Sequence, residues 1–104
     1  MFARVVRFEG VTDAEWEVGD GWFREDFVPR ALETDGFEGS YLLVDHDRGT
    51  VLTVTLWTDQ QALEATGDSV KKFLAQYTPF SGPEPVVETF EIAHAELRPG
   101  TARS

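Results

Sequence analysis

Alternation of apolar and polar residues marks four stretches of the chain, and a period of two is typical of β-strands. All four stretches are rich in β-branched, aromatic and aliphatic residues, which suit a pleated sheet. The predicted strands cover residues 2–9, 41–44, 51–57 and 86–96. The second and third are separated by residues 45–49, Asp-His-Asp-Arg-Gly, a composition typical of turns. The sequence therefore predicts a central β-hairpin.

Between the first two strands, apolar residues at helical spacing predict a helix over residues 22–33. A capping box, in which Glu15 follows Thr12 by three residues, predicts a separate short helical turn ahead of it. We expect residues 19–21, Gly-Asp-Gly, to interrupt the two, with Asp20 as the N-cap of the longer helix.

Proline and glycine residues are expected to divide both helical regions. Pro29 lies inside the first region, where it removes a backbone donor, so we expect a bend or a restart there. The second region follows the hairpin and begins at a second capping box, formed by Thr58 and Gln61. Gly67 breaks or restarts this helix, which ends near Tyr77.

The order of the predicted elements is β-α-β-β-α-β. This is the ferredoxin-like α+β arrangement, a four-stranded antiparallel sheet with two helices on one face. One face of the third strand is apolar throughout and predicts the core face: Leu52, Val54 and Leu56. The other face is apolar at its ends and polar in its middle: Val51, Thr53, Thr55 and Trp57. We expect this second face to lie away from the helices and to be buried by a second copy of the chain, which makes a homodimer.

Length and charge narrow the class of protein. The 104 residues allow a single domain, assigned to residues 1–97, with a flexible C-terminal tail over residues 98–104. The formal charge of −10 argues against binding to nucleic acid or to an anionic membrane surface. No apolar run approaches the roughly 20 residues of a membrane-spanning helix. The chain has no cysteine, and its N-terminus alternates like a strand rather than a signal peptide, so we expect a cytoplasmic protein.

Two short motifs resemble the dimeric α/β-barrel superfamily, and most closely its antibiotic-biosynthesis-monooxygenase-type domains. The first is Gly-Phe-x-Gly before the second strand, here residues 36–39. The second is Trp-x-x-x-x-Ala at the start of the second helix, here Trp57 to Ala62. The resemblance covers about residues 2–96 and implies a dimeric α/β barrel that takes a small apolar or aromatic ligand. The family includes cofactor-free quinol monooxygenases, haem-degrading monooxygenases, muconolactone-isomerase-like enzymes and members without known activity.

The haem-degrading branch of this family uses an Asn on the first strand, a Trp in the second helix and a haem-ligating His later in that helix. This sequence contains no Asn, and the other two positions fall near Thr66 and Gln76. We therefore expect no cofactor. The resemblance then implies a cofactor-independent, monooxygenase-like enzyme acting on a small aromatic or quinol-type substrate. The alternatives are a non-catalytic small-ligand-binding or orphan member and, third, an isomerase or lyase.

His94 and Arg4 are the candidate catalytic residues. Each lies on a strand face that is otherwise apolar, and a charged group there needs a partner or a pocket. Because the first and last strands pair antiparallel, we expect Arg4 to lie near His94. His94 would take a phenolic proton and Arg4 would stabilise the resulting oxyanion. The alternative is that both side chains lie at the rim of the sheet and reach water.

The candidate substrate-binding residues are aromatic: Trp22, Phe23, Phe27, Tyr41, Trp57 and Phe90. The first three line a pocket between helix and sheet, or else fill the core; Trp57 contacts a ligand or only packs. No metal site is expected. The turn segment Asp45-His46-Asp47 carries ligand-type side chains, but three adjacent residues do not converge easily on one ion, so a solvated turn is the simpler interpretation.

Overall fold

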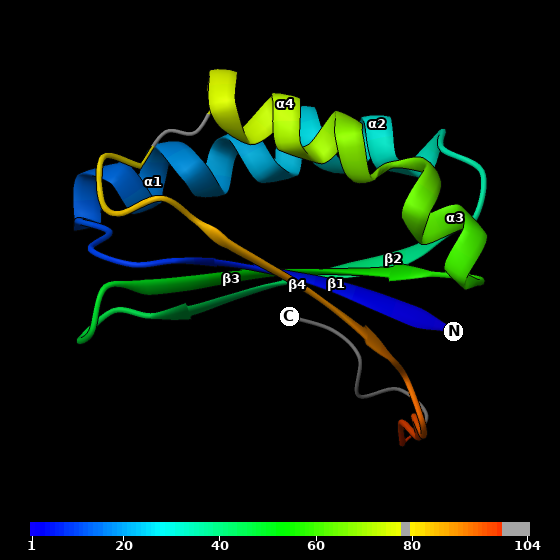
Figure 1. Cartoon of the computed structure of the whole chain (residues 1–104). Coiled ribbons are helices and arrows are strands. Elements are labelled where there is room, and N and C mark those ends of the chain that lie inside the picture. The colour runs from blue at the N-terminus through cyan, green and yellow to red at the C-terminus, as the bar shows by residue number, and fades with distance from the viewer. Residues whose placement is uncertain (78–79, 99–104) are drawn as a thin grey trace.

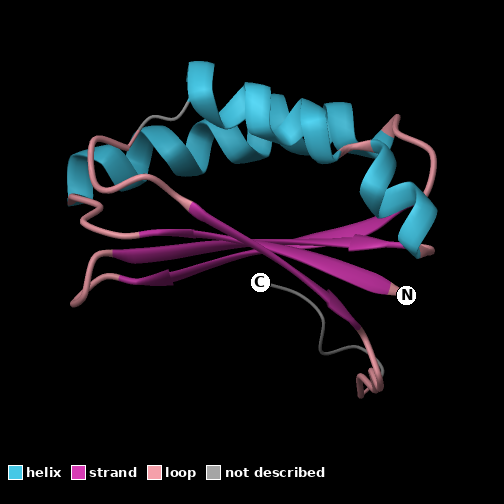
Figure 2. Ribbon diagram, viewed as in Figure 1, coloured by secondary structure: helices cyan, strands magenta, loops and turns pink. Residues whose placement is uncertain are grey.

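The computed structural model describes residues 1–77 and 80–98. Its elements are β1 (Phe2–Phe8), α1 (Asp13–Trp22), η1 (Phe23–Phe27), α2 (Val28–Leu32), β2 (Phe37–Asp45), β3 (Thr50–Trp57), α3 (Gln60–Ala65), α4 (Gly67–Tyr77) and β4 (Val86–Glu91). The strands form one antiparallel sheet in the order β2-β3-β1-β4. The helices lie on one side of this sheet (Figures 1 and 2). The predicted ferredoxin-like α+β fold is confirmed.

The first helical region is continuous from Asp13 to Leu32, so the predicted interruption at residues 19–21 is wrong. The capping box that opens it is present: Thr12 N donates to Glu15 Oε1 at 3.2 Å, and Glu15 N donates to Thr12 Oγ1 at 3.2 Å. Gly19 is buried inside the helix, where tertiary packing offsets the weak helix propensity of glycine.

Asp20 is not an N-cap. It lies within α1 and accepts a hydrogen bond from Arg24 Nε at 2.7 Å, one helical turn further on. At Pro29, where a bend or a restart is predicted, the backbone stays helical and changes from a π-helical turn to α2, which begins at Val28 with the proline in its first turn. The segment just before it, η1, is a π-helical turn in which Val28 N donates to Phe23 O.

The second helical region divides into α3 and α4 at Thr66, as Gly67 predicts. Its N-cap is Asp59, whose Oδ1 accepts from Ala62 N at 2.8 Å, so the capping box at Thr58 and Gln61 is wrong. The Thr58 hydroxyl instead lies 3.0 Å from the carbonyl oxygen of Gly36.

The two sequence motifs meet at this point in the fold. Gly36 has a φ of +86°, and a side chain on it would collide with Ala62 at the start of α3. Both residue types are therefore required by close packing between the start of β2 and α3.

The mixed face of β3 lies under the helices, which overturns the prediction that it faces away from them. In the register of β1 and β3, Arg4 is opposite Thr55 and Val6 is opposite Thr53. Val51 and Trp57, at the two ends of this face, are only 1% and 4% exposed. Alternation identifies residues that share a face, but it does not say which face the helices cover.

The opposite face of the sheet has no helix over it among the described residues (Figure 1). It carries the apolar residues predicted for the core, and they are half-buried: Leu52, Val54 and Leu56. Tyr41 and Leu43 on β2 add to this face and are 43% and 45% exposed.

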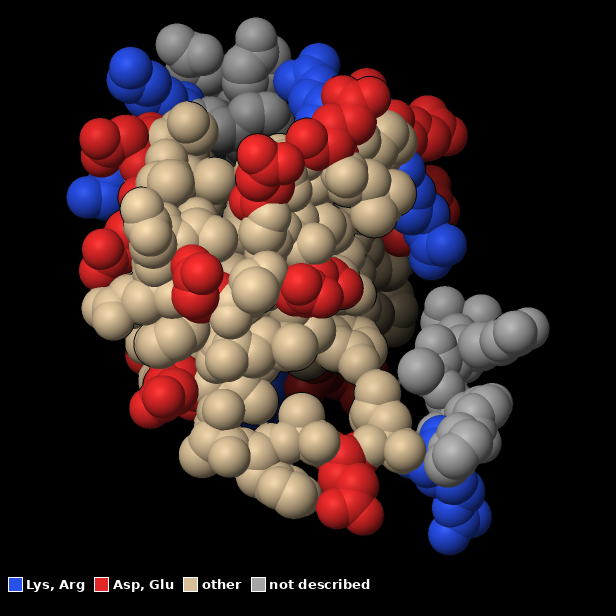
Figure 3. All heavy atoms as spheres, turned by 90° about the vertical axis from the view of Figure 1, so that its right-hand side faces the viewer, with Lys and Arg blue, Asp and Glu red and all other residues tan. Residues whose placement is uncertain are grey.

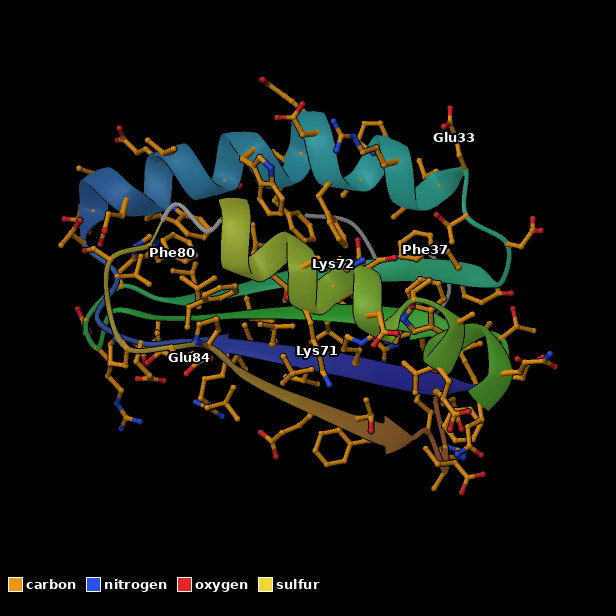
Figure 4. The ribbon with its side chains drawn as sticks, turned by 45° about the horizontal axis from the view of Figure 1, so that its top comes forward. Glu33, Phe37, Lys71, Lys72, Phe80 and Glu84 are labelled. Carbon is orange, nitrogen blue, oxygen red and sulfur yellow. The ribbon has the colours of Figure 1, made fainter. Side chains whose placement is uncertain are left out.

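Two aromatic pairs close the ends of the layer between helices and sheet. Phe80 packs edge-on against Phe8, with ring centroids 4.8 Å apart, and Phe37 packs against Trp57 at 5.5 Å. Figure 4 shows Phe80 and Phe37 at opposite ends of the molecule. The core cluster of Val6, Phe8, Val11 and Val51 lies at the Phe80 end. A cavity lies between these two ends, in the middle of the layer.

The last strand is shorter than predicted. It ends at Glu91, not at residue 96, because its partner β1 begins at Phe2 and Phe2 is opposite Glu91. Residues 92–98 then run below the sheet, on the side away from the helices (Figure 1). Apart from Arg98, the tail predicted for residues 98–104 lies outside the described residues.

The acidic excess is distributed over the surface. Figure 3 shows Asp and Glu side chains scattered over one end of the molecule, with Lys and Arg towards its edges. None of the described helices is long and apolar enough to cross a membrane.

Candidate functional site

A cavity of about 210 Å³ lies between the first helical region and the sheet. Its aromatic wall is formed by four of the predicted substrate-binding residues: Trp22, Phe23, Phe27 and Trp57. The Phe23 and Phe27 rings stack at 5.1 Å with an angle of 18° between their planes. Their edges and faces offer a flat apolar surface that matches an aromatic ligand.

Arg4 lies on β1 at the sheet side of this cavity and is only 4% exposed. Its Nη1 donates to Thr66 Oγ1 at 3.0 Å, and its Nη2 donates to the carbonyl oxygen of Leu63. Both acceptors lie at the end of α3, where the Leu63 carbonyl oxygen also accepts from Thr66 N at 3.3 Å and from Thr66 Oγ1 at 3.0 Å. Arg4 therefore joins β1 to the end of α3, and its side chain also lines the cavity.

No carboxylate of the described residues lies within ion-pair distance of Arg4. Burial lowers the pKa of its guanidinium, but arginine stays protonated at neutral pH. The guanidinium carbon also lies 5.7 Å from the centre of the Trp57 ring, a cation–π distance. A buried positive charge that only neutral groups contact favours an anionic group in the cavity.

The sheet contributes hydroxyl groups beside Arg4. Trp57 Nε1 donates to Thr55 Oγ1 at 3.0 Å, which fixes the indole against the sheet. Thr53 on β3 and Ser69 on α4 also line the cavity. Asp26 and Arg30, both exposed, line it from the first helical region. The site is therefore apolar over most of its lining, with Arg4, a few hydroxyl groups, Asp26 and Arg30 as its polar residues.

His94 does not belong to this site, and the expected proximity of Arg4 and His94 is wrong. Arg4 is opposite Thr89 on β4, whereas His94 lies beyond the end of that strand. The His94 side chain is 78% exposed and its Nε2 lies 3.2 Å from Glu96 Oε1. Two of the predicted substrate-binding residues are also elsewhere: Tyr41 is on the open face of the sheet, and Phe90 is 51% exposed on β4.

Phe90 lines a second hollow, a groove of about 450 Å³ between β1, β4 and the helices α3 and α4. Lys71 extends over β1 from α4 and also lines it (Figure 4). Arg4 and Val70 border both the groove and the cavity. The groove has Glu64 and Glu91 beside Lys71, so its charge is mixed.

Sequence reasoning missed the hydroxyl groups and Asp26. The polar middle of β3 is a signal for Thr53 and Thr55, but from the sequence alone it predicts a face that lies away from the helices. The resemblance to the family also points to Thr66, because the haem-degrading branch uses a Trp near that position. For Asp26 and Ser69 the sequence offers no signal, because both are ordinary exposed helix residues. Among the described residues, no group of three or more His, Cys, Asp or Glu side chains is placed to hold a metal ion.

No family model and no curated protein matches the sequence. Solved structures match over most of the chain. A monooxygenase of Streptomyces coelicolor from ActVA-Orf6, in complex with nanaomycin D, has a TM-score of 0.73 and 17% identity, covering 93% of this chain and 91% of that one. SnoaB of Streptomyces nogalater, a cofactor-independent oxygenase, has a TM-score of 0.62 and 20% identity, covering 90% and 94%.

A dimeric ferredoxin-like protein from an uncultured marine organism has a TM-score of 0.67 and 10% identity, covering 93% of this chain and 98% of that one. At such identities the likeness shows a shared fold. It is the fold of antibiotic-biosynthesis-monooxygenase-like, ferredoxin-fold proteins, and the resemblance found in the sequence is confirmed at this level.

Proposed function

We propose that the protein is a cofactor-independent, monooxygenase-like enzyme that acts on a small aromatic or quinol-type molecule. The observation that carries the proposal is Arg4, a buried cation held by neutral oxygens at the edge of an aromatic cavity. Its charge would stabilise the anion of a phenol or enol held between the rings. The likeness of the fold to a monooxygenase bound to nanaomycin D and to SnoaB supports this class of reaction.

The reaction needs only the substrate and molecular oxygen. Removal of one proton from an activated CH₂ group gives an anion that is electron-rich enough to react with oxygen directly. One oxygen atom enters the product as a carbonyl group, and the other leaves as water with the two hydrogens of the CH₂ group. The protein would bind the ring system, hold the anion beside Arg4 and exclude bulk water from it.

We also propose that the chain forms a homodimer through the open face of its sheet. That face presents contiguous apolar residues, and exposed apolar patches of this kind mark interaction surfaces. The fold likeness to a dimeric ferredoxin-like protein supports the same arrangement. A two-fold axis would bring two such faces together without leaving either exposed.

Oxygen uptake by the purified protein with anthrone as substrate tests the activity. We expect uptake above the spontaneous rate, reduced about 100-fold or more by Arg4→Met. Arg48→Met is the matched control, because Arg48 is an exposed arginine in the hairpin turn, outside the cavity. Equal uptake by the wild type and Arg4→Met would contradict the assigned role of Arg4.

A non-catalytic, ligand-binding protein is the second candidate, and the position of His94 favours it. The histidine expected to accept the substrate proton lies outside the cavity. Anthraquinone, which resembles the product and does not react further, tests this candidate by quenching the fluorescence of Trp22 and Trp57. Quenching without oxygen uptake would support the binding protein, and the absence of both would contradict a small aromatic ligand.

A further inference from the structure

Asp26 lines the cavity, whereas His94, the residue expected to accept the substrate proton, is exposed outside it. Among the described residues that line the cavity, Asp26 is the only one with a carboxylate, and none is a histidine. The other polar groups there are Thr and Ser hydroxyls and two arginines, Arg4 and Arg30, which do not accept protons at neutral pH. A reaction that starts with proton removal therefore finds its base at Asp26.

The π-helical turn η1 places Asp26 on the cavity side of the helix. Trp22, Asp26 and Arg30 are spaced four residues apart, and all three line the cavity. In a regular α-helix of 3.6 residues per turn, positions four apart drift around the axis by about 40° at each step. The wider turn from Phe23 to Val28 reduces that drift. Such turns inside α-helices are frequent at functional sites.

The Asp26 carboxylate is also not engaged elsewhere, as far as the described residues show. The nearby cation Arg24 is paired with Asp20 at 2.7 Å instead. The charged groups that share the cavity with Asp26 are Arg4 on β1 and Arg30 on α2. The described lining residues of β3 and α4 carry no titratable group: Thr53, Thr55, Trp57, Ser69 and Val70. Because Asp26 is exposed, its proton can exchange with solvent.

We propose that Asp26 is the general base of the oxygenation, an inference that rests on the proposed function. A carboxylate oxygen of Asp26 takes the proton from the substrate CH₂ group, and the anion that remains faces Arg4. The anion adds oxygen to form a peroxide anion, which the protonated Asp26 neutralises to a hydroperoxide. Loss of the second C–H proton and cleavage of the oxygen–oxygen bond then give the carbonyl group and one water molecule, and Asp26 is again ionised.

The test compares Asp26→Asn with Glu25→Gln, the adjacent exposed acid of the same π turn, which does not line the cavity. With anthrone at pH 7, we expect Asp26→Asn to lower kcat/KM about 100-fold and Glu25→Gln to leave it unchanged. The loss should shrink towards alkaline pH, where the substrate ionises without help from the protein. Binding of anthraquinone, followed by tryptophan fluorescence, should change less than about threefold in both variants.

A second variant separates chemistry from structure. Asp26→Ala should regain part of its activity in the presence of sodium formate, because a small carboxylate can enter the space that the side chain vacated; Glu25→Ala should not respond. Wild-type rates in Asp26→Asn, or parallel losses of binding and turnover, would overturn the assignment of the base while the proposed function stands. Absence of oxygen uptake by the wild type, with Asp26 intact, would instead overturn the proposed function.

Discussion

The sheet face under the helices is more polar in its middle than the face that the helices leave open. The covered face places Arg4 and Thr55 opposite each other, beside Val6 and Thr53. The open face has Val5 opposite Val54, with Leu52 and Leu56 on the same side of β3; its charged residues include Arg7 on β1 and Glu88 on β4. In a small domain with a dry core and one wetted face, the polarity would be the reverse. The difference is what we expect if the covered face binds a ligand and the open face binds a second copy, as proposed above.

Each face has its own reason for this composition. A cation and hydroxyl groups under a helical layer cost stability unless they are hydrogen-bonded, and Arg4 and Thr55 both are. Both also line the cavity, and we propose that this is their functional role. The apolar residues of the open face cost little in folding, but they favour association with another apolar surface. We therefore propose that the covered face binds a ligand and that the open face binds a second copy of the chain.

Arg4→Met gives the largest expected change. Removing the charge from the covered face should lower oxygen uptake about 100-fold to 1,000-fold, the usual effect of losing one group that stabilises an oxyanion. The melting temperature should shift by less than about 5 °C, because methionine fills the space and a buried charge is removed. Leu63 O keeps a donor in the Thr66 hydroxyl at 3.0 Å.

Differential scanning calorimetry and oxygen electrodes measure the two effects on the same sample. A large fall in melting temperature would show that Arg4 mainly caps α3. In that case the polarity of the covered face would be a structural feature rather than a functional one.

Val54→Asp tests the open face. A charge at the centre of an apolar interface should weaken the dimer at least about 100-fold, because the carboxylate loses its hydration there. Val18→Asp is the control, since Val18 is 63% exposed on α1, away from the sheet. Sedimentation equilibrium should give a monomer for the first variant and a dimer for the second. A wild-type mass of 11.7 kDa in solution would contradict the role of the open face.

The sequence predicts this fold well because the fold depends on local signals. Alternation marks the strands, and the Thr12–Glu15 capping box opens α1. Only glycine fits at position 36, because Ala62 comes too close for a side chain there. The order of the elements then leaves few topologies, and one of them is ferredoxin-like.

The candidate site is predicted only in part, for two physical reasons. Polar residues in a strand are normally placed outside, so Thr53 and Thr55 indicate an outward face unless a cavity is known. Alternation also continues to residue 96, but β4 ends at Glu91, opposite the first residue of β1, and Ile92 N then makes one more hydrogen bond, to Met1 O at 2.9 Å. His94 therefore lies beyond the sheet. Arg4 is opposite Thr89 rather than near His94, because alternation does not fix the register between two strands.

Two threonines of the covered face are expected to differ when each is replaced by valine. Thr55→Val should lower the free energy of unfolding by about 1–3 kcal/mol, since the buried Trp57 Nε1 loses its acceptor. Thr53→Val should change it by less than about 0.5 kcal/mol, because the Thr53 hydroxyl borders the cavity. Urea unfolding of both variants measures the contrast. Equal losses would mean that the hydroxyls stabilise the fold alike, independently of Trp57.

The smallest expected effect concerns a hydrogen bond at the edge of the helical layer, between Glu15 on α1 and Ser81 in the loop before β4. Glu15 Oε2 accepts from Ser81 N at 2.8 Å, so α1 is joined to the loop before β4. Hydrogen bonds from Ser81 and Thr12 lower the pKa of Glu15 from 4.5 to about 2. Because the pKa is lower in the folded state, this contribution to stability is complete above about pH 4.5 and is lost as the pH falls towards 2.

Glu15→Gln should therefore melt slightly below the wild type at pH 7, and the gap between the two should close between pH 4.5 and pH 2. Glu17→Gln, an exposed acid on the same helix, should show no such convergence. Thermal unfolding followed by circular dichroism across this pH range measures the gap. A gap that stays constant down to pH 2 would mean that the charge of Glu15 does not hold the loop. The helical layer would then be kept over the polar face by its aromatic contacts, Phe80 on Phe8 among them.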